Sequence, residues 1–132
     1  MQAAVSLEKT GAKRLCEHIL GLDSEILFTS IISRDGDEIA SASKPSVPLL
    51  IGMAPQLRET YTAAANTIVG LFKRAELLLG ELAFIVGSYK ALNVVIVNLG
   101  EKNNAMAVLV TTKDLDSKNV TYQISRVTRN LV

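Results

Sequence analysis

Cys16 and His18 are the only cysteine and the only histidine of the chain, so a thiolate activated by an imidazole is the first chemistry to test. The two positions are separated by two residues in a helical pattern, which turns their side chains to different sides of the helix. Cys16 falls on the apolar side and is interpreted as a small core residue, whereas His18 is interpreted as solvated. A single cysteine also excludes an intramolecular disulfide, a zinc knuckle and a redox pair within one chain.

Three carboxylates, those of Asp35, Asp37 and Glu38, gather where the sequence predicts a turn. Carboxylate oxygens at this density could bind a hard cation such as Ca²⁺ or Mg²⁺. The segment lacks the spacing of an EF-hand loop, so a solvated turn is the favoured interpretation. We expect neither a metal nor a cofactor.

The sequence contains none of the glycine patterns that support common enzyme chemistry. There is no G-x-x-x-x-G-K-[ST] phosphate loop, no G-x-G-x-x-G dinucleotide fingerprint and no G-x-S-x-G nucleophile elbow. The formal net charge is only +1, and the six Phe and Tyr residues are dispersed, so a nucleic-acid partner is not expected. We predict a protein that is not an enzyme.

A chain of 132 residues with 48% hydrophobic residues and a mean hydropathy of +0.28 can bury a core of its own. The length predicts a single domain over residues 1–132, of which residues 1–5 are expected to be loose. No apolar run approaches the length of a membrane span, and no secretory leader begins the chain, so we expect a cytoplasmic protein.

Hydrophobic periodicity predicts the elements of this domain in the order helix, two strands, long helix, three strands, helix. Hairpins joined by one long crossover favour an α+β fold with an antiparallel five-stranded sheet, α-β-β-α-β-β-β-α. Gly21 is expected to end the first helix, and Asp116 or Ser117 to cap the last. The predicted helices span 6–20, 55–79 and a segment from about 117, and the predicted strands span 26–32, 38–42, 81–88, 92–99 and 105–112.

The long helix carries a strip of small residues, Ala63, Thr67 and Gly70, at helical spacing. Glycine inside a helix costs about 1 kcal/mol relative to alanine, so some compensating contact is expected. A strip without bulky side chains would let a neighbouring backbone approach closely and would form a dimer contact. The alternative is an ordinary wide apolar face that includes a glycine by chance.

The connector over residues 44–54 contains two of the three prolines and yet is apolar at its centre. An apolar loop implies packing against something, either the sheet of the same chain or the surface of a partner. The residues that would form such a partner surface are Leu49, Leu50, Ile51 and Met53.

The hairpin Ser33-Arg34-Asp35-Gly36 followed by Glu38-Ile39-Ala40-Ser41, together with the element order over about residues 15–131, resembles the Roadblock/LC7 family, whose fold is related to longin and profilin. Members of that family are typically non-catalytic dimers that act as scaffolds or as regulators of small Ras-like GTPases, notably in prokaryotes. The proline-rich connector departs from the family pattern.

The resemblance implies a dimer in which the long helix packs on its mate and the following strand pairs across the two-fold axis. It would place Leu82, Phe84 and Val86 in the interface together with the small-residue strip. The implied function is a dimeric adaptor or regulator of a small GTPase. A PAS-like sensor, with a small molecule between sheet and helix and residues 47–53 as its lid, and a structural assembly subunit are the alternatives.

Overall fold

The computed structural model describes residues 8–33, 37–45, 59, 63, 67, 75–100 and 102–129. Its elements follow one another in the predicted order. The helices and strands are α1 (Lys9–Leu22), β1 (Ile26–Ser33), β2 (Glu38–Ser43), α3 (Glu76–Leu79), β3 (Phe84–Ser88), β4 (Asn93–Asn98), β5 (Ala105–Thr111) and α4 (Ser117–Arg129).

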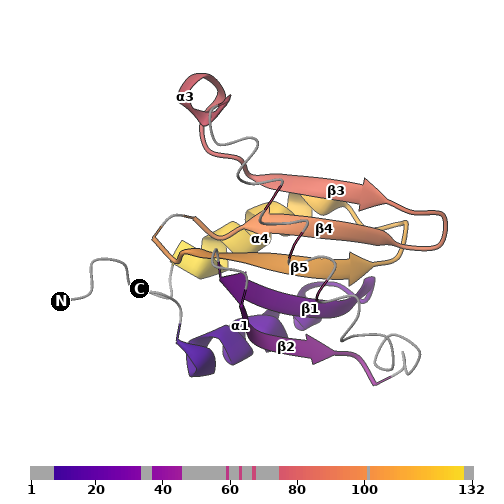
Figure 1. Cartoon of the computed structure of the whole chain (residues 1–132). Helices are drawn as coiled ribbons and strands as arrows, with labels where there is room; N and C mark the ends of the chain where they lie inside the picture. The colour runs from indigo at the N-terminus through magenta and orange to yellow at the C-terminus, as the bar shows by residue number, and fades with distance from the viewer. Residues whose placement is uncertain are drawn as a thin grey trace.

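The five strands form one sheet in the order β2-β1-β5-β4-β3, in which every neighbouring pair is antiparallel (Figure 1). The β1–β2 hairpin and the β3–β4 hairpin therefore flank a central strand, β5, that comes from late in the chain. This arrangement confirms the predicted α+β class and the antiparallel five-stranded sheet.

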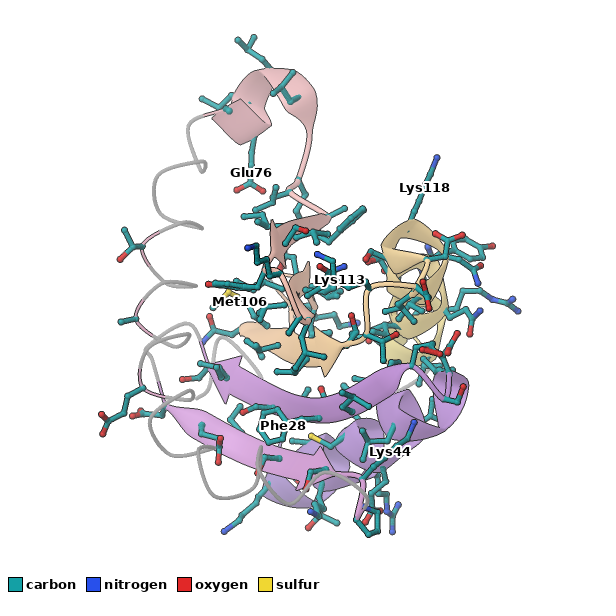
Figure 2. All side chains as sticks on the ribbon, turned by 90° about the vertical axis from the view of Figure 1, so that its right-hand side faces the viewer. Phe28, Lys44, Glu76, Met106, Lys113 and Lys118 are labelled. Carbon is teal, nitrogen blue, oxygen red and sulfur yellow. The ribbon has the colours of Figure 1, made fainter. Side chains whose placement is uncertain are left out.

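Helices α1 and α4 lie side by side on one face of the sheet, which we call the helix face (Figures 1 and 2). The apolar sides of the two helices meet alternate residues of the strands, as the two-residue period of a strand requires. The core on this face contains Leu15, Ile19, Val95, Leu109 and Ile124, each 0–1% exposed.

The opposite face of the sheet carries a second apolar cluster that includes Phe28, Ile96, Met106 and Val108. Figure 2 shows Met106 on the side of the sheet away from α4. All seven residues of β5 are buried, as expected for a central strand that is apolar on both faces. The register between β1 and β5 shifts between Ile26 and Phe28, and this bulge turns the two side chains to opposite faces.

The ends of α1 and α4 are fixed by aspartates. Helix α1 continues through Gly21 to Leu22, so the prediction that Gly21 ends it was wrong. The turn follows Asp23, whose Oδ1 accepts a hydrogen bond from the Glu25 N–H at 2.8 Å. Asp116 caps α4 as predicted, since its Oδ1 accepts from the Asn119 N–H at 3.2 Å.

The hairpin of β1 and β2 is closed by a backbone hydrogen bond from the Ser33 N–H to the Asp37 carbonyl at 2.8 Å. This confirms the predicted hairpin, although residues 34–36 lie outside the described part of the chain. Among the described residues, no helix has the length and apolar character needed to cross a membrane.

Replacement of Ile19 tests the helix-face core, because this side chain is fully buried while its neighbour His18 is exposed. Ile19→Ala should lower the free energy of unfolding by about 2–5 kcal/mol through lost burial and a residual cavity. His18→Ala is the matched control and should change it by less than about 0.5 kcal/mol. Urea unfolding followed by circular dichroism measures both, and equal effects would contradict the assignment of α1 faces.

Candidate protein-interaction site

Strand β3 forms one edge of the sheet, and the described residues pair it only with β4. An edge strand presents every second backbone N–H and C=O away from its neighbour, and these groups can pair with another strand. Proteins usually block such an edge with charged side chains or proline. The sequence of β3, Phe-Ile-Val-Gly-Ser, contains neither.

Both ends of β3 are held in place from within the same chain. At its start, Asn98 donates from Nδ2 to the Leu82 carbonyl at 2.8 Å, and its backbone N–H donates to the Ala83 carbonyl at 3.0 Å. At its far end, the Lys113 ammonium donates to Ser88 Oγ and to the Tyr89 carbonyl, both at 2.5 Å. The edge strand is therefore held in register before any partner binds.

Lys113 makes a third hydrogen bond, to Asn93 Oδ1 at 2.8 Å. Its ammonium thus connects the end of β5 to both strands of the β3–β4 hairpin. All three donors of the ammonium are used, which makes this exposed lysine a structural residue of the edge.

Helix α3 stands beyond β3, outside the area of the sheet (Figure 1). Its position is fixed by Glu76, which points back toward the sheet in Figure 2 and accepts a hydrogen bond at Oε2 from the Leu82 N–H at 3.0 Å. Gly80, with φ of 86°, then ends the helix by donating its N–H to the Glu76 carbonyl.

Three consecutive leucines of α3, Leu77, Leu78 and Leu79, are 83–91% exposed. Among the described residues six large hydrophobic side chains are exposed, and five of them lie within residues 77–89, where Val86 and Tyr89 complete the set. Exposed apolar side chains concentrated in one region indicate a surface that binds another protein. We call β3 and α3 together the edge site.

The edge site includes part of the interface implied by the sequence. Val86 is 39% exposed, in agreement with that role, whereas Leu82 and Phe84 are half-buried and Phe84 packs against the helix-face core. Ala63 and Thr67 are helical and exposed, and Thr67 Oγ1 donates to the Ala63 carbonyl at 2.9 Å. None of these observations tests the interface itself, which stays a prediction.

Several predicted residues lie outside the described part of the chain. They are Gly70 of the small-residue strip, Asp35 of the acidic turn, and the connector residues Leu49, Leu50, Ile51 and Met53.

Sequence reasoning placed Leu78 and Leu79 on the buried face of the long helix, and this was wrong. Helix α3 lies beyond β3, so no strand of the described residues lies beneath these side chains. A signal was present in the sequence. Consecutive helical residues point about 100° apart, so three adjacent leucines cannot all face one sheet.

Cys16, the candidate nucleophile, is a core residue of the described structure. Cys16 is fully buried, and desolvation raises the pKa of its thiol from 9.0 to about 12. His18 is exposed on another side of α1, as predicted. Glu38 accepts a hydrogen bond from Ser30 Oγ at 2.8 Å, and the described residues contain no group of three potential metal ligands.

Comparison with solved structures shows the same fold in bacterial proteins. A Roadblock/LC7 domain from Streptomyces avermitilis superposes with a TM-score of 0.67 over 90% of this chain and 92% of that one, at 11% identity. MglB from Myxococcus xanthus gives 0.68 over 92% of each chain at 12% identity, and MglC from the same organism gives 0.62 over 90% of this chain and 97% of that one at 13% identity. No protein-family model matches the sequence, and no curated protein sequence matches it significantly.

The raised pKa of Cys16 predicts a thiol that is inert in the folded protein. At about pH 8 a thiol reagent should label Cys16 only after denaturant unfolds the chain. Between pH 9 and about 12 the unfolded thiol ionises while the folded one stays protonated, so this contribution to stability is present below pH 9 and is lost as pH rises. Cys16→Ala should therefore lose less unfolding free energy than the wild type over this pH range. Rapid labelling of Cys16 without denaturant would refute its assignment to the core.

Proposed function

We propose that this chain, which has the Roadblock/LC7 fold, is a non-catalytic adaptor or regulator that works as a homodimer joined through the edge site. One observation carries the proposal: the unprotected edge strand β3 lies next to three exposed leucines of α3. A second copy of the chain is the occupant because the edge site offers both halves of a self-complementary contact, a strand to be paired and an apolar helix end to be covered.

In this dimer two β3 strands run antiparallel across a two-fold axis and join two five-stranded sheets into one. Backbone hydrogen bonds supply the register, which the contacts of Asn98 and Lys113 fix in each protomer beforehand. Helix α3 extends beyond its own sheet, so in the dimer Leu77, Leu78 and Leu79 would pack against the partner and become buried. The small-residue strip would then face its counterpart on the mate.

The partner of this dimer is proposed to be a small Ras-like GTPase in the cytoplasm. The support is the fold shared with Roadblock/LC7, MglB and MglC structures and the family resemblance of the hairpin sequence. The lack of phosphate-binding motifs in this chain fits a protein that regulates nucleotide hydrolysis in another protein. A structural assembly subunit would use the same dimer with a different partner.

Two substitutions test the dimer. Val86→Asp places like charges near each other across the two-fold axis, and Leu78→Asp puts a charge into the apolar contact of α3. Each should weaken the dimer at least about a hundredfold and give monomers at micromolar concentration in analytical ultracentrifugation. Leu78 is 91% exposed in the monomer, so its replacement leaves folding intact.

Tyr122→Asp is the control, because it introduces the same charge at an exposed apolar residue of α4, outside the edge site. It should remain dimeric. A monomeric wild-type protein, or variants that dimerise as the control does, would refute the edge-site dimer.

A pull-down that compares GDP with a non-hydrolysable GTP analogue tests the GTPase partner. The immobilised protein should retain, from the cytoplasm of its own cell, a small protein with a phosphate-loop motif whose recovery changes with the nucleotide. The same pull-down with Leu78→Asp shows whether the partner binds only to the dimer. Recovery of partners without such a motif would contradict GTPase regulation and favour the assembly subunit.

A further inference from the structure

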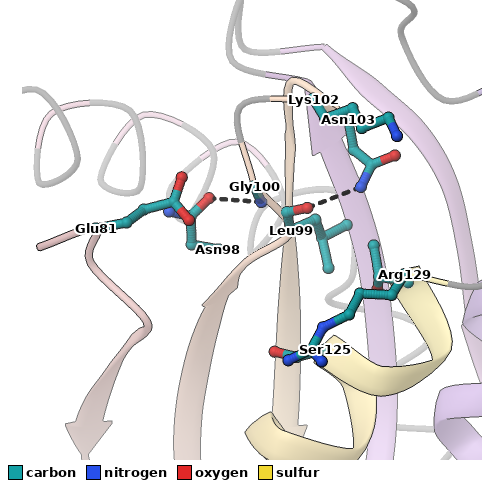
Figure 3. Close-up of a pocket in the computed structure, with 9 residues that line it drawn as sticks. Glu81, Asn98, Leu99, Gly100, Lys102, Asn103, Ser125 and Arg129 are labelled. Carbon is teal, nitrogen blue, oxygen red and sulfur yellow. Dashed lines mark hydrogen bonds between the residues drawn. The ribbon is translucent and has the colours of Figure 1, made fainter.

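A polar pocket of about 340 Å³ lies away from the strand pairing of β3, where the β4–β5 turn meets the last turn of α4 (Figure 3). Its walls come from three parts of the chain that are distant in sequence. Glu81 precedes β3, Asn98–Asn103 connect β4 to β5, and Ser125–Arg129 belong to α4. The volume falls in the range of sites that bind small molecules.

The described residues of the β4–β5 turn are joined by side-chain hydrogen bonds beside this pocket. Asn98 Oδ1 accepts from the Gly100 N–H at 3.0 Å, and Asn103 Nδ2 donates to the Leu99 carbonyl at 2.8 Å (Figure 3). Gly100 and Asn104 both have positive φ, 95° and 51°, which the Asn98 and Asn103 contacts stabilise. The pocket therefore exists before a ligand arrives.

Asn103 is 8% exposed although it lines the pocket. Its Nδ2 donates to the Leu99 carbonyl, which leaves Oδ1 as the other polar atom of the carboxamide. An amide oxygen can only accept a hydrogen bond. Asn103 thus offers an acceptor among the residues that line the pocket.

Three ionisable side chains line the same pocket without pairing. Lys102 and Arg129 are cationic and Glu81 is anionic, and the structure records no ion pair or hydrogen bond for these side chains with any described residue. In Figure 3 Glu81 and Arg129 lie toward opposite ends of the pocket. Opposite charges that face one space without meeting are suited to a ligand that carries both charges.

We propose that this pocket binds a free acidic amino acid, of the aspartate or glutamate type. Its carboxylates would pair with Arg129 and Lys102, and its ammonium would donate to Glu81 and to Asn103 Oδ1. Among the lining residues that the structure describes, two cations stand against one carboxylate, and this excess of one positive charge matches the net charge of −1 of such a ligand. All the lining residues belong to one protomer, so the proposal does not depend on the GTPase partner.

Calorimetry with matched ligands tests the proposal on the full chain. Glutamate should bind at least about tenfold more tightly than glutarate, which keeps both carboxylates and lacks the ammonium. Arg129→Gln should weaken glutamate at least about tenfold. Glu81→Gln should weaken glutamate and leave glutarate unchanged or tighter, because only glutamate brings the ammonium.

Arg126→Gln is the control, since this arginine belongs to the same helix but stacks on the Tyr122 ring at 5.9 Å, outside the pocket. It should bind glutamate as the wild type does. N-acetyl-glutamate amide represents an acidic side chain of a protein partner, and equal binding of this compound would overturn the free amino acid. Equal binding of glutarate, an equal effect of Arg126→Gln, or no binding of glutamate up to about 10 mM would likewise overturn it.

Discussion

The structure depends on a central strand that is apolar on both faces. All seven residues of β5 are buried, and β5 lies between β1 and β4, whose residues divide between the two apolar clusters. A strand of this kind is stable only when both faces of its sheet are excluded from water. Helices α1 and α4 cover the helix face. The two edges of the sheet are not covered in this way.

The two edges of the sheet are treated differently. The outer strand β2 carries Glu38 and serines and lies against α1, whereas β3 is apolar, short and supported at each end by side chains from other strands. Asn98 and Lys113 hold β3 through hydrogen bonds at its two ends, and they do not cover the unpaired backbone edge of the strand. An edge strand that is both ordered and exposed is the main support for the proposed dimer.

Much of the fold could be predicted because its signals are local. Short, β-branched apolar runs bounded by turns predict the strands, and Asp35 and Gly36 predict the first hairpin. The limits of helices were predicted less well. Gly21 is a local stop signal, yet α1 continues to Leu22 and the turn is made after it, by Asp23. The leucines of α3 were predicted to be buried because periodicity does not tell where the sheet beneath a helix ends. The polar pocket could not be predicted at all, since Glu81, Lys102 and Arg129 line one space only once the sheet and α4 are assembled.

The pairing of β1 with β5 also determines when the protein can fold. Ile26 pairs with Thr111, so the innermost hydrogen bonds of the sheet join residues 85 positions apart. Contacts between distant residues slow folding, because a long loop must close before they form. During synthesis on the ribosome, the hairpin of β1 and β2 emerges before β5 has been made, so β1 then lacks its second neighbour in the sheet. Until β5 emerges, the apolar residues of this half-formed sheet are available to a chaperone or to another unfolded chain.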